Sequence, residues 1–377
     1  MATSSKWLGT IKGHVGEAKA IFADDKRTRE AAEKAPKSII LTEHDLKSGV
    51  WDTNKVLKTT LGGVLRDIVA DDLAAFRHNM QTAQSRFEMG KSGQGLTARQ
   101  IIDLATSAPL LYKKNPKYVS DIDKARKEIT MAVAVSALND EVRFLTNAGP
   151  DSDANVTRHH VVVRFNAFDD AVRKLATKKL DDATAPKQIA NWLRKQKLAF
   201  DCDCGRHRYF LRYVATIGGF AAGRPEMGYP KIRNPGLQGV ACKHVLRVMS
   251  ELESSNLVLN FLTGHLTKLH QSVNHKARTQ ATQKDAEATI EKIENGRTRA
   301  IKTSDMRKEE ARKAAERKAI KEAASKAKRT TTARKPLATR RIEDALLSGK
   351  LTEAALATFR EYGFSDAKID KLVAKKK

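Results

Sequence analysis

The three cysteines of the chain and one histidine form a pattern that could bind a metal ion. Cys202 and Cys204 are two residues apart, and after 37 intervening residues Cys242 and His244 repeat this spacing. Three thiolates and one imidazole make a donor set that suits tetrahedral zinc. Because the protein would fill all four positions, no position is left for a substrate. The pattern therefore predicts a structural zinc site rather than a catalytic one.

Two other interpretations of these residues remain open. Cysteines in a long chain are often small buried apolar residues, and a CxC pair can form a redox-active disulfide. His207, three residues after Cys204, is an alternative fourth ligand to His244. Three cysteines in 377 residues are too few for a disulfide framework, which indicates a reducing compartment.

Two predicted strands lead to the first half of the pattern. Residues 160–165 are β-branched and form a short run, which is typical of a buried strand, and a second strand is predicted through residues 198–200. Residues two apart on a strand point to the same side. We therefore expect Cys202 and Cys204 to face one ion and Asp203 to face away from it.

The second half of the pattern precedes a predicted helix over residues 240–252. Cys242 and His244 would lie on nearly opposite sides of a regular helix, so they are expected in an irregular first turn. Residues 209–217 are aromatic and β-branched and predict a further strand. A loop rich in glycine and proline, residues 218–239, follows this strand.

The CxC, spacer and CxH pattern resembles the SWIM-type zinc finger, a family in which a β-hairpin carrying CxC faces a helix that begins with CxH. The resemblance covers about forty-five residues. It implies that Cys202, Cys204, Cys242 and His244 bind zinc, and that the module serves protein interaction or nucleic-acid binding. The spacer is longer than is usual in the family, which predicts an added loop.

The charge of the chain indicates an acidic or polyanionic partner. Lys and Arg number 70 against 44 Asp and Glu, which gives a net charge of +26. Cationic residues interleaved with aromatic residues can contact phosphates and bases, or they can form a solvated face or a subunit contact. The candidate contacts to nucleic acid or to a protein partner are Arg206, Arg208, Arg212, Arg224, Lys231, Arg233, Lys326, Lys328, Arg329, Arg334, Lys335, Arg340 and Arg341.

Four regions are predicted, in a fold of the α+β class that is predominantly α. Residues 1–150 form a helical N-terminal domain that begins with an amphipathic helix over residues 7–34 and ends at a turn-rich linker. Residues 151–272 form a small α+β module held together by zinc. Residues 273–336 form a long basic helix or a disordered arm. Residues 337–377 form a small helical C-terminal module.

The basic arm is predicted from composition. No aromatic residue occurs between Phe261 and Phe359, so this stretch has too little apolar area for a core of its own. Residues 302–341 contain fifteen Lys or Arg and five Asp or Glu, a local net charge of +10. Pairs such as Glu309 and Lys313, four residues apart, favour a helix here.

Two further patterns carry less weight. Gly90-Lys91-Ser92 looks like the end of a phosphate-binding loop, but the motif lacks its first glycine and no strand precedes it, so an ordinary loop is predicted. His159 and His160 are adjacent and should face opposite sides of a strand. We expect one of these histidines to be buried and the other exposed.

The sequence favours a protein without enzymatic activity, because it contains no nucleophile elbow, acidic metal cluster or dinucleotide fingerprint. Residues 200–249 are similar to virion structural proteins of tailed bacteriophages. This resemblance implies a homo-oligomeric assembly protein in the virion or host cytoplasm, in contact with other virion proteins and with packaged DNA. The alternative is a nucleic-acid-binding protein without sequence preference. No membrane span and no signal peptide are predicted.

Overall fold

The computed structural model divides the chain into two compact units, residues 1–304 and residues 305–377. It describes residues 40–48, 57–87, 95–114, 117–150, 155–179, 182–272, 277–294, 298–347, 353–361 and 363–374, with Ala23, Arg27 and Ser152. Ala23 and Arg27 are helical; the rest of the amphipathic helix predicted over residues 7–34, and the loop predicted at residues 90–92, lie outside the described residues.

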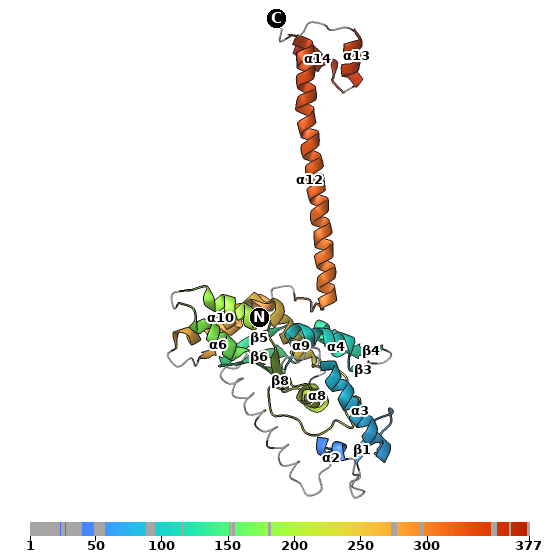
Figure 1. Cartoon of the computed structure of the whole chain (residues 1–377), viewed down its shortest axis with the longest axis vertical. Helices are drawn as coiled ribbons and strands as arrows, with labels where there is room; N and C mark the ends of the chain where they lie inside the picture. The colour runs from blue at the N-terminus through green and yellow to red at the C-terminus, as the bar shows by residue number, and fades with distance from the viewer. Residues whose placement is uncertain are drawn as a thin grey trace. The chain divides into compact units, whose positions relative to one another are not determined.

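A five-stranded antiparallel sheet forms the centre of the first unit (Figure 1). The strand order is β8-β7-β6-β5-β9. The strands are β5 (Ala132–Leu138), β6 (Glu141–Asn147), β7 (Arg158–Phe165), β8 (Leu198–Cys202) and β9 (Arg278–Gln280). The predicted strands before the CxC pair are confirmed as β7 and β8.

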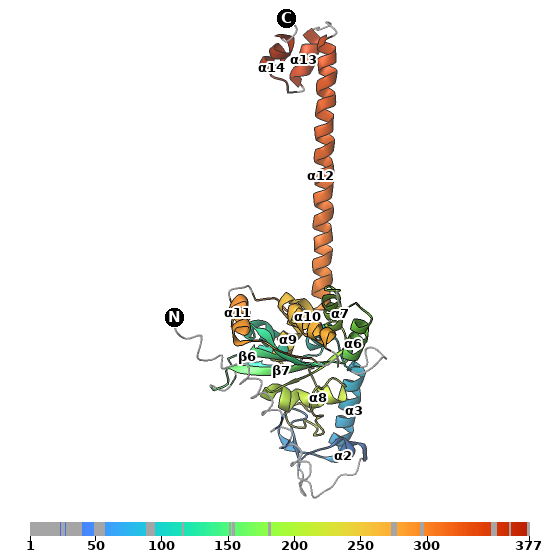
Figure 2. The ribbon, with the colours of Figure 1, turned by 90° about the vertical axis from the view of Figure 1, so that its left-hand side faces the viewer.

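One face of this sheet packs against two consecutive helices. Phe144, Val161 and Cys202 are opposite one another in the strand register, so their side chains share a face. All three are fully buried. Figure 2 places two helices over the sheet, α9 (Lys243–Ser254) and α10 (Asn256–Gln271). The register thus directs Cys202 toward the layer that contains α9.

Other helices pack around this layer. One of them is α4 (Ala98–Ser107), which begins after Thr97, where Thr97 and Gln100 form a capping box. Among the described residues of the unit, the other helices are α2 (Glu43–Ser48), α3 (Ala70–Phe87), α5 (Asp121–Glu128), α6 (Phe168–Ala176), α7 (Ala185–Leu193), η1 (His207–Leu211), α8 (Arg212–Ile217) and α11 (Gln283–Glu294). Two hairpins pair β1 (Lys58–Thr59) with β2 (Arg66–Asp67), and β3 (Leu111–Lys114) with β4 (Lys117–Ser120).

The structure corrects the predicted boundary at residue 150. Residues 132–147, predicted as helical, form β5 and β6, and β6 pairs with β7 across the predicted linker. The first 150 residues are therefore not a separate helical domain. Short apolar runs are ambiguous between helix and strand until their pairing partner is known, which explains the error.

Residues 209–217 are helical, not a strand. They lie in the π-helix η1 and in α8. Tyr213, Val214 and Ala215 are buried, so tertiary packing of this apolar run outweighs the β-propensity of its aromatic and branched residues. Residues 209–217 therefore supply no strand that pairs with the segment carrying the CxC pair.

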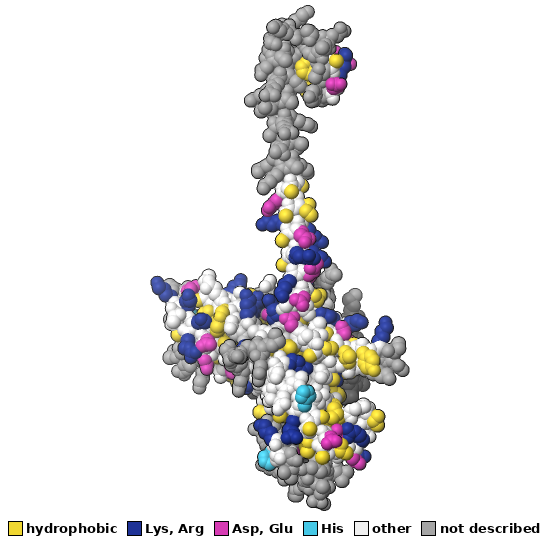
Figure 3. All heavy atoms as spheres, turned by 45° about the vertical axis from the view of Figure 1, so that its right-hand side comes forward, with side chains coloured by type: hydrophobic (Ala, Val, Ile, Leu, Met, Phe, Trp, Pro, Cys, Tyr) yellow, Lys and Arg dark blue, Asp and Glu magenta, His cyan; other side chains and the backbone are white. Residues whose placement is uncertain are grey.

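The second unit confirms a long basic helix and a helical C-terminal region. α12 (Ser304–Leu347) is 44 residues long, which corresponds to about 66 Å, and α13 (Glu353–Glu361) and α14 (Asp366–Ala374) follow it. The predicted pair Glu309 and Lys313 has a nitrogen–oxygen distance of 3.3 Å. Both cationic and acidic side chains lie on the exposed surface of the described part of α12 (Figure 3). The helix begins later and ends later than the predicted arm.

Candidate metal centre

The four predicted ligands come together at one buried position. Cys202 is the last residue of β8, Cys242 is the N-cap residue of α9, and His244 lies in the first turn of that helix. One potential ligand atom from each of these residues and from Cys204 lies within 4.8 Å of the others. The structure therefore confirms that a possible metal site forms from two segments 37 residues apart.

The backbone conformation of Cys242 explains how two ligands only two residues apart can face the same point at the start of α9. Its φ of −75° and ψ of 165° are extended, so the residue stands outside the helical spiral. The side chains of Cys242 and His244 can then approach the same point, although two residues on a regular helix would diverge. This is the irregular first turn that the sequence predicts.

The orientation of His244 is set by a backbone carbonyl group. Its Nε2 atom lies 3.0 Å from the carbonyl oxygen of Ala148, which can only accept, so Nε2 donates the hydrogen. The other ring nitrogen, Nδ1, is buried and has no hydrogen-bond partner within the described residues. A neutral imidazole held in this way presents the lone pair of Nδ1 to a metal ion.

The pKa values of the Cys202 and Cys242 thiols are shifted in opposite directions. Burial raises the pKa of the Cys202 thiol well above its usual value. Burial acts in the same direction on Cys242, but hydrogen bonds from Cys202, Cys204 and the backbone N–H of Val245 outweigh it and lower the pKa. Negative charge therefore accumulates on the sulfur at the N-terminus of α9, where the helix dipole also favours an anion.

His207, the alternative fourth ligand, has a different role. Its Nε2 atom lies 2.9 Å from Oδ1 of Asp201, while its backbone N–H donates to Sγ of Cys204 at 3.3 Å. Asp201 also accepts from Arg212 at 3.0 Å. The backbone of His207 thus supports a sulfur ligand, whereas its Nε2 atom lies beside Asp201 without forming a hydrogen bond, and the cluster of possible ligand atoms contains His244 and not His207. This decides between the two histidines in favour of His244.

Polar residues whose contacts the sequence did not predict lie beside His244. Asp203 faces away from the cluster as predicted; its Oδ1 lies 2.7 Å from Nδ1 of His159 and its Oδ2 accepts the N–H of His160 at 3.1 Å. The ring of His159 packs on that of His244 with centroids 4.3 Å apart. Burial alone would lower the pKa of His159, but the Asp203 carboxylate outweighs it and raises the pKa.

The expected contrast between His159 and His160 is wrong. His160 is buried, but the His159 side chain is only 13% exposed because it lies between Asp203 and His244. The signal that could have identified His159 is its position two residues before Val161, which pairs with Cys202. That signal depends on the strand register and not on the local sequence.

Two predicted contacts to a partner are enclosed in the fold. The guanidinium group of Arg206 lies 3.8 Å from the ring centroid of Tyr112 and 3.0 Å from a carboxylate oxygen of Asp121. Arg212 is 5% exposed and binds Asp201. Both arginines therefore stabilise the fold, which corrects their assignment to a partner surface.

The other predicted cationic contacts fall into two groups. Arg233 is exposed, and Arg208, Arg224 and Lys231 are half-buried. Burial lowers the pKa of Lys231. The remaining residues belong to α12, and their side chains lie outside the described part of the structure: Lys326, Lys328, Arg329, Arg334, Lys335, Arg340 and Arg341.

Comparisons with known proteins found no match to this chain. No family model matches the chain, and no curated protein or solved structure matches it. Among the described helices, none combines the length and apolar character needed to cross a bilayer.

Proposed function

We propose that this chain is a structural zinc protein without enzymatic activity, in which the metal fixes a rigid folded unit for assembly. The observation that carries the proposal is the buried convergence of three cysteines and one histidine. Four protein ligands complete the tetrahedral coordination of zinc, and burial of all four leaves no path for a substrate. Such a site stabilises a fold and does not catalyse a reaction.

Zinc is the metal that best suits these donors. Thiolates select softer metals, and a set of three sulfurs and one imidazole nitrogen is typical of structural zinc. The ion would join the end of β8 to the start of α9, which are far apart in the sequence. Zinc binding contributes about 10 kcal/mol to folding in small zinc modules, so this link would dominate local stability.

Metal analysis of the full-length protein tests the zinc proposal. We expect one zinc per chain in protein purified under reducing conditions, and less than a tenth of that content in a Cys242→Ser variant. Replacement of zinc by cobalt should give the intense visible absorption of a tetrahedral thiolate site. Folded wild-type protein with no metal and with three titratable thiols would contradict the proposal.

The assembly that we propose is the virion of a tailed bacteriophage, with other copies of the chain and other virion proteins as partners. The support is the resemblance of residues 200–249 together with α12. The side chains of residues 308–325 are exposed or half-buried around the helix, as in a helix that bridges separate bodies or awaits a partner. Defined oligomers that persist after nuclease treatment are expected in size-exclusion chromatography with light scattering.

Binding of nucleic acid without sequence preference is the second candidate function. The net charge of +26 favours it, since phosphate contacts supply most of the affinity of nonspecific binding. The same chromatography separates the two candidates. A particle that falls to a monomer when nuclease is added indicates assembly on nucleic acid rather than between protein surfaces.

A further inference from the structure

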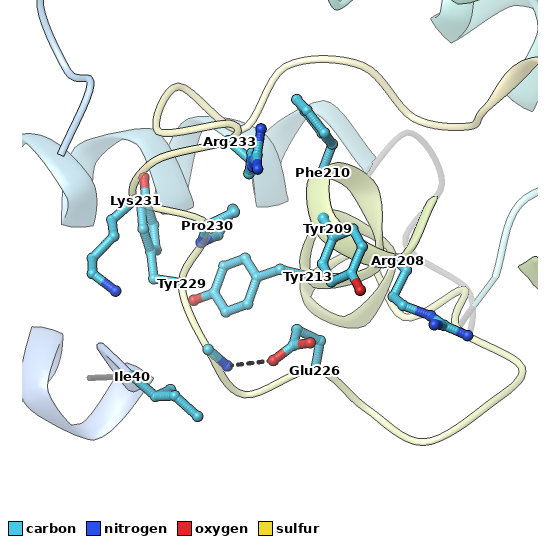
Figure 4. Close-up of a pocket in the computed structure, with 11 residues that line it drawn as sticks. Ile40, Arg208, Tyr209, Phe210, Tyr213, Glu226, Tyr229, Pro230, Lys231 and Arg233 are labelled. Carbon is cyan, nitrogen blue, oxygen red and sulfur yellow. Dashed lines mark hydrogen bonds between the residues drawn. The ribbon is translucent and has the colours of Figure 1, made fainter. Parts of the chain in front are cut away.

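A small pocket is lined mainly by residues that lie between the metal ligands in the sequence, but none of the ligands lines it. η1 and α8 line one side of it, and residues 226–233 line the other (Figure 4). These segments belong to the spacer between Cys204 and Cys242. The volume of about 160 Å³ is below the range of roughly 300–1,000 Å³ for drug-sized ligands, so the pocket suits a single ring system.

The buried lining of the pocket is aromatic and rigid. Tyr213 and Tyr229 are buried, and their ring centroids are 5.3 Å apart in an edge-on arrangement. The hydroxyl group of Tyr229 donates to the carbonyl oxygen of Pro235 at 2.6 Å, which fixes the ring. Tyr209 lies at the accessible side and is 55% exposed. An exposed tyrosine next to buried rings offers a face on which a planar group can stack.

Charge is divided between the interior and the rim of the pocket. Glu226 is 5% exposed, and its Oε1 accepts the backbone N–H of Gly228 at 2.9 Å. Arg233 is exposed and Arg208 and Lys231 are half-buried, and Figure 4 shows these three side chains around the tyrosine rings. A buried carboxylate repels an anion in the interior, whereas the rim attracts one.

We propose that this pocket binds one unstacked base of single-stranded nucleic acid, with the base against Tyr209 and the flanking phosphates on Arg208, Lys231 and Arg233. A nucleotide has the required division of charge, a neutral ring joined to an anionic backbone. Neither inorganic phosphate nor an acidic side chain has it. The proposal adds a ligand site to the structural role and does not depend on the metal being zinc.

Binding of a fluorescent 12-residue thymidine oligonucleotide to the full-length protein tests the pocket. Stacking on one aromatic side chain contributes enough affinity that Tyr209→Ala should weaken binding by about 5- to 150-fold, while Tyr209→Phe should retain it. Arg233→Ala should lower the slope of log affinity against log salt by about 0.7. The matched control is Tyr118→Ala, because Tyr118 is 64% exposed and does not line the pocket.

A photo-crosslink locates the base directly. An oligonucleotide with one 5-iodouracil should crosslink to Tyr209 or Phe210 in wild-type protein, and Tyr209→Ala should lose the Tyr209 product. Equal affinities of Tyr209→Ala and Tyr118→Ala would overturn the proposal, as would crosslinks confined to α12. If the pocket instead binds an aromatic side chain of a protein partner, Tyr209→Ala and Tyr118→Ala will bind the oligonucleotide with equal affinity. Metal content measured on each variant separates loss of the pocket from loss of the metal centre.

Discussion

Gly149 lies against the side chain of Lys243, the residue between the two ligands of α9. A Cβ atom at Gly149 would be 2.7 Å from Nζ of Lys243, which itself lies 2.7 Å from a carboxylate oxygen of Glu128. Gly149 also has a φ of +84°, a conformation that disfavours other residues. Its neighbour Ala148 is the residue that orients His244. A backbone turn far from the ligands in sequence thus supports the metal centre.

Gly149→Ala should therefore lower the free energy of unfolding by about 1–3 kcal/mol, because it combines a left-handed alanine with displacement of Lys243. Urea unfolding measures the effect. The matched control is Gly264→Ala, since Gly264 lies in α10 with no atom within 4 Å of an added Cβ. This helical alanine should raise stability by about 0.5–1 kcal/mol. Similar changes in the two variants would contradict the argument.

Substitutions of His244 and His207 should differ in their effect on metal binding. His244→Ala removes a ligand and should abolish stoichiometric binding, whereas His207→Gln should retain the metal because the His207 side chain lies beside Asp201 and is not part of the cluster. Competition with a chromophoric chelator measures both affinities. If His207→Gln loses the metal and His244→Ala retains it, His207 and not His244 is the fourth ligand.

Arg247 should be a major determinant of stability. It is 1% exposed and donates to the carbonyl oxygens of Ala125, Ile129 and Arg299 at 3.0, 2.6 and 2.7 Å. Arg247→Met leaves these carbonyl groups without a charged donor and should cost about 3 kcal/mol or more.

The unfolding midpoint in urea reports this loss. Arg173→Met is the control, because the Arg173 side chain is 73% exposed, and it should change stability by less than about 0.5 kcal/mol. Equal midpoints for the two variants would mean that the three carbonyl groups are satisfied in another way.

His265 should make stability depend on pH. Burial lowers its pKa below the usual 6.5, and its ring bonds to Thr279 and to the carbonyl oxygen of Asn139. Below pH 6.5 the unfolded chain binds a proton that the folded chain does not. The contribution of His265 is therefore complete above pH 6.5 and is lost as the pH falls, by at most about 1.4 kcal/mol per pH unit.

Unfolding at pH 7.5 and pH 5.5 in wild type and His265→Gln isolates this effect, because the contribution of the metal centre is common to both proteins. Wild type should lose more stability than the variant over this interval. Identical losses would show that His265 titrates alike in the folded and unfolded chain.

Much of the local structure was predictable from residue types at short spacing. The run before Phe165 and the pair Glu309 and Lys313 each depend on residues within a few positions of one another. The two strands β5 and β6 were not predictable in this way, because their apolar runs became strands by pairing with β7 and β9.

The cationic residues of the spacer illustrate the same limit. Arg206, Arg208 and Arg212 look equivalent in the sequence, yet Arg212 is buried on Asp201 and Arg206 lies on Tyr112. Which arginine faces solvent depends on the turn of η1 and on an acidic residue from another part of the chain. A strand in place of η1 would have distributed these side chains differently.

The sequence alone determined the donor set, since three cysteines and a histidine in two close pairs limit the chemistry to soft metal binding or thiol redox reactions. The tertiary structure decided which histidine completes the set. His244 and His207 are both close to cysteines in the chain, but only His244 has its ring turned by a carbonyl group, that of Ala148, which leaves Nδ1 for the cluster. That choice depends on contacts between segments almost 100 residues apart, which local spacing does not encode.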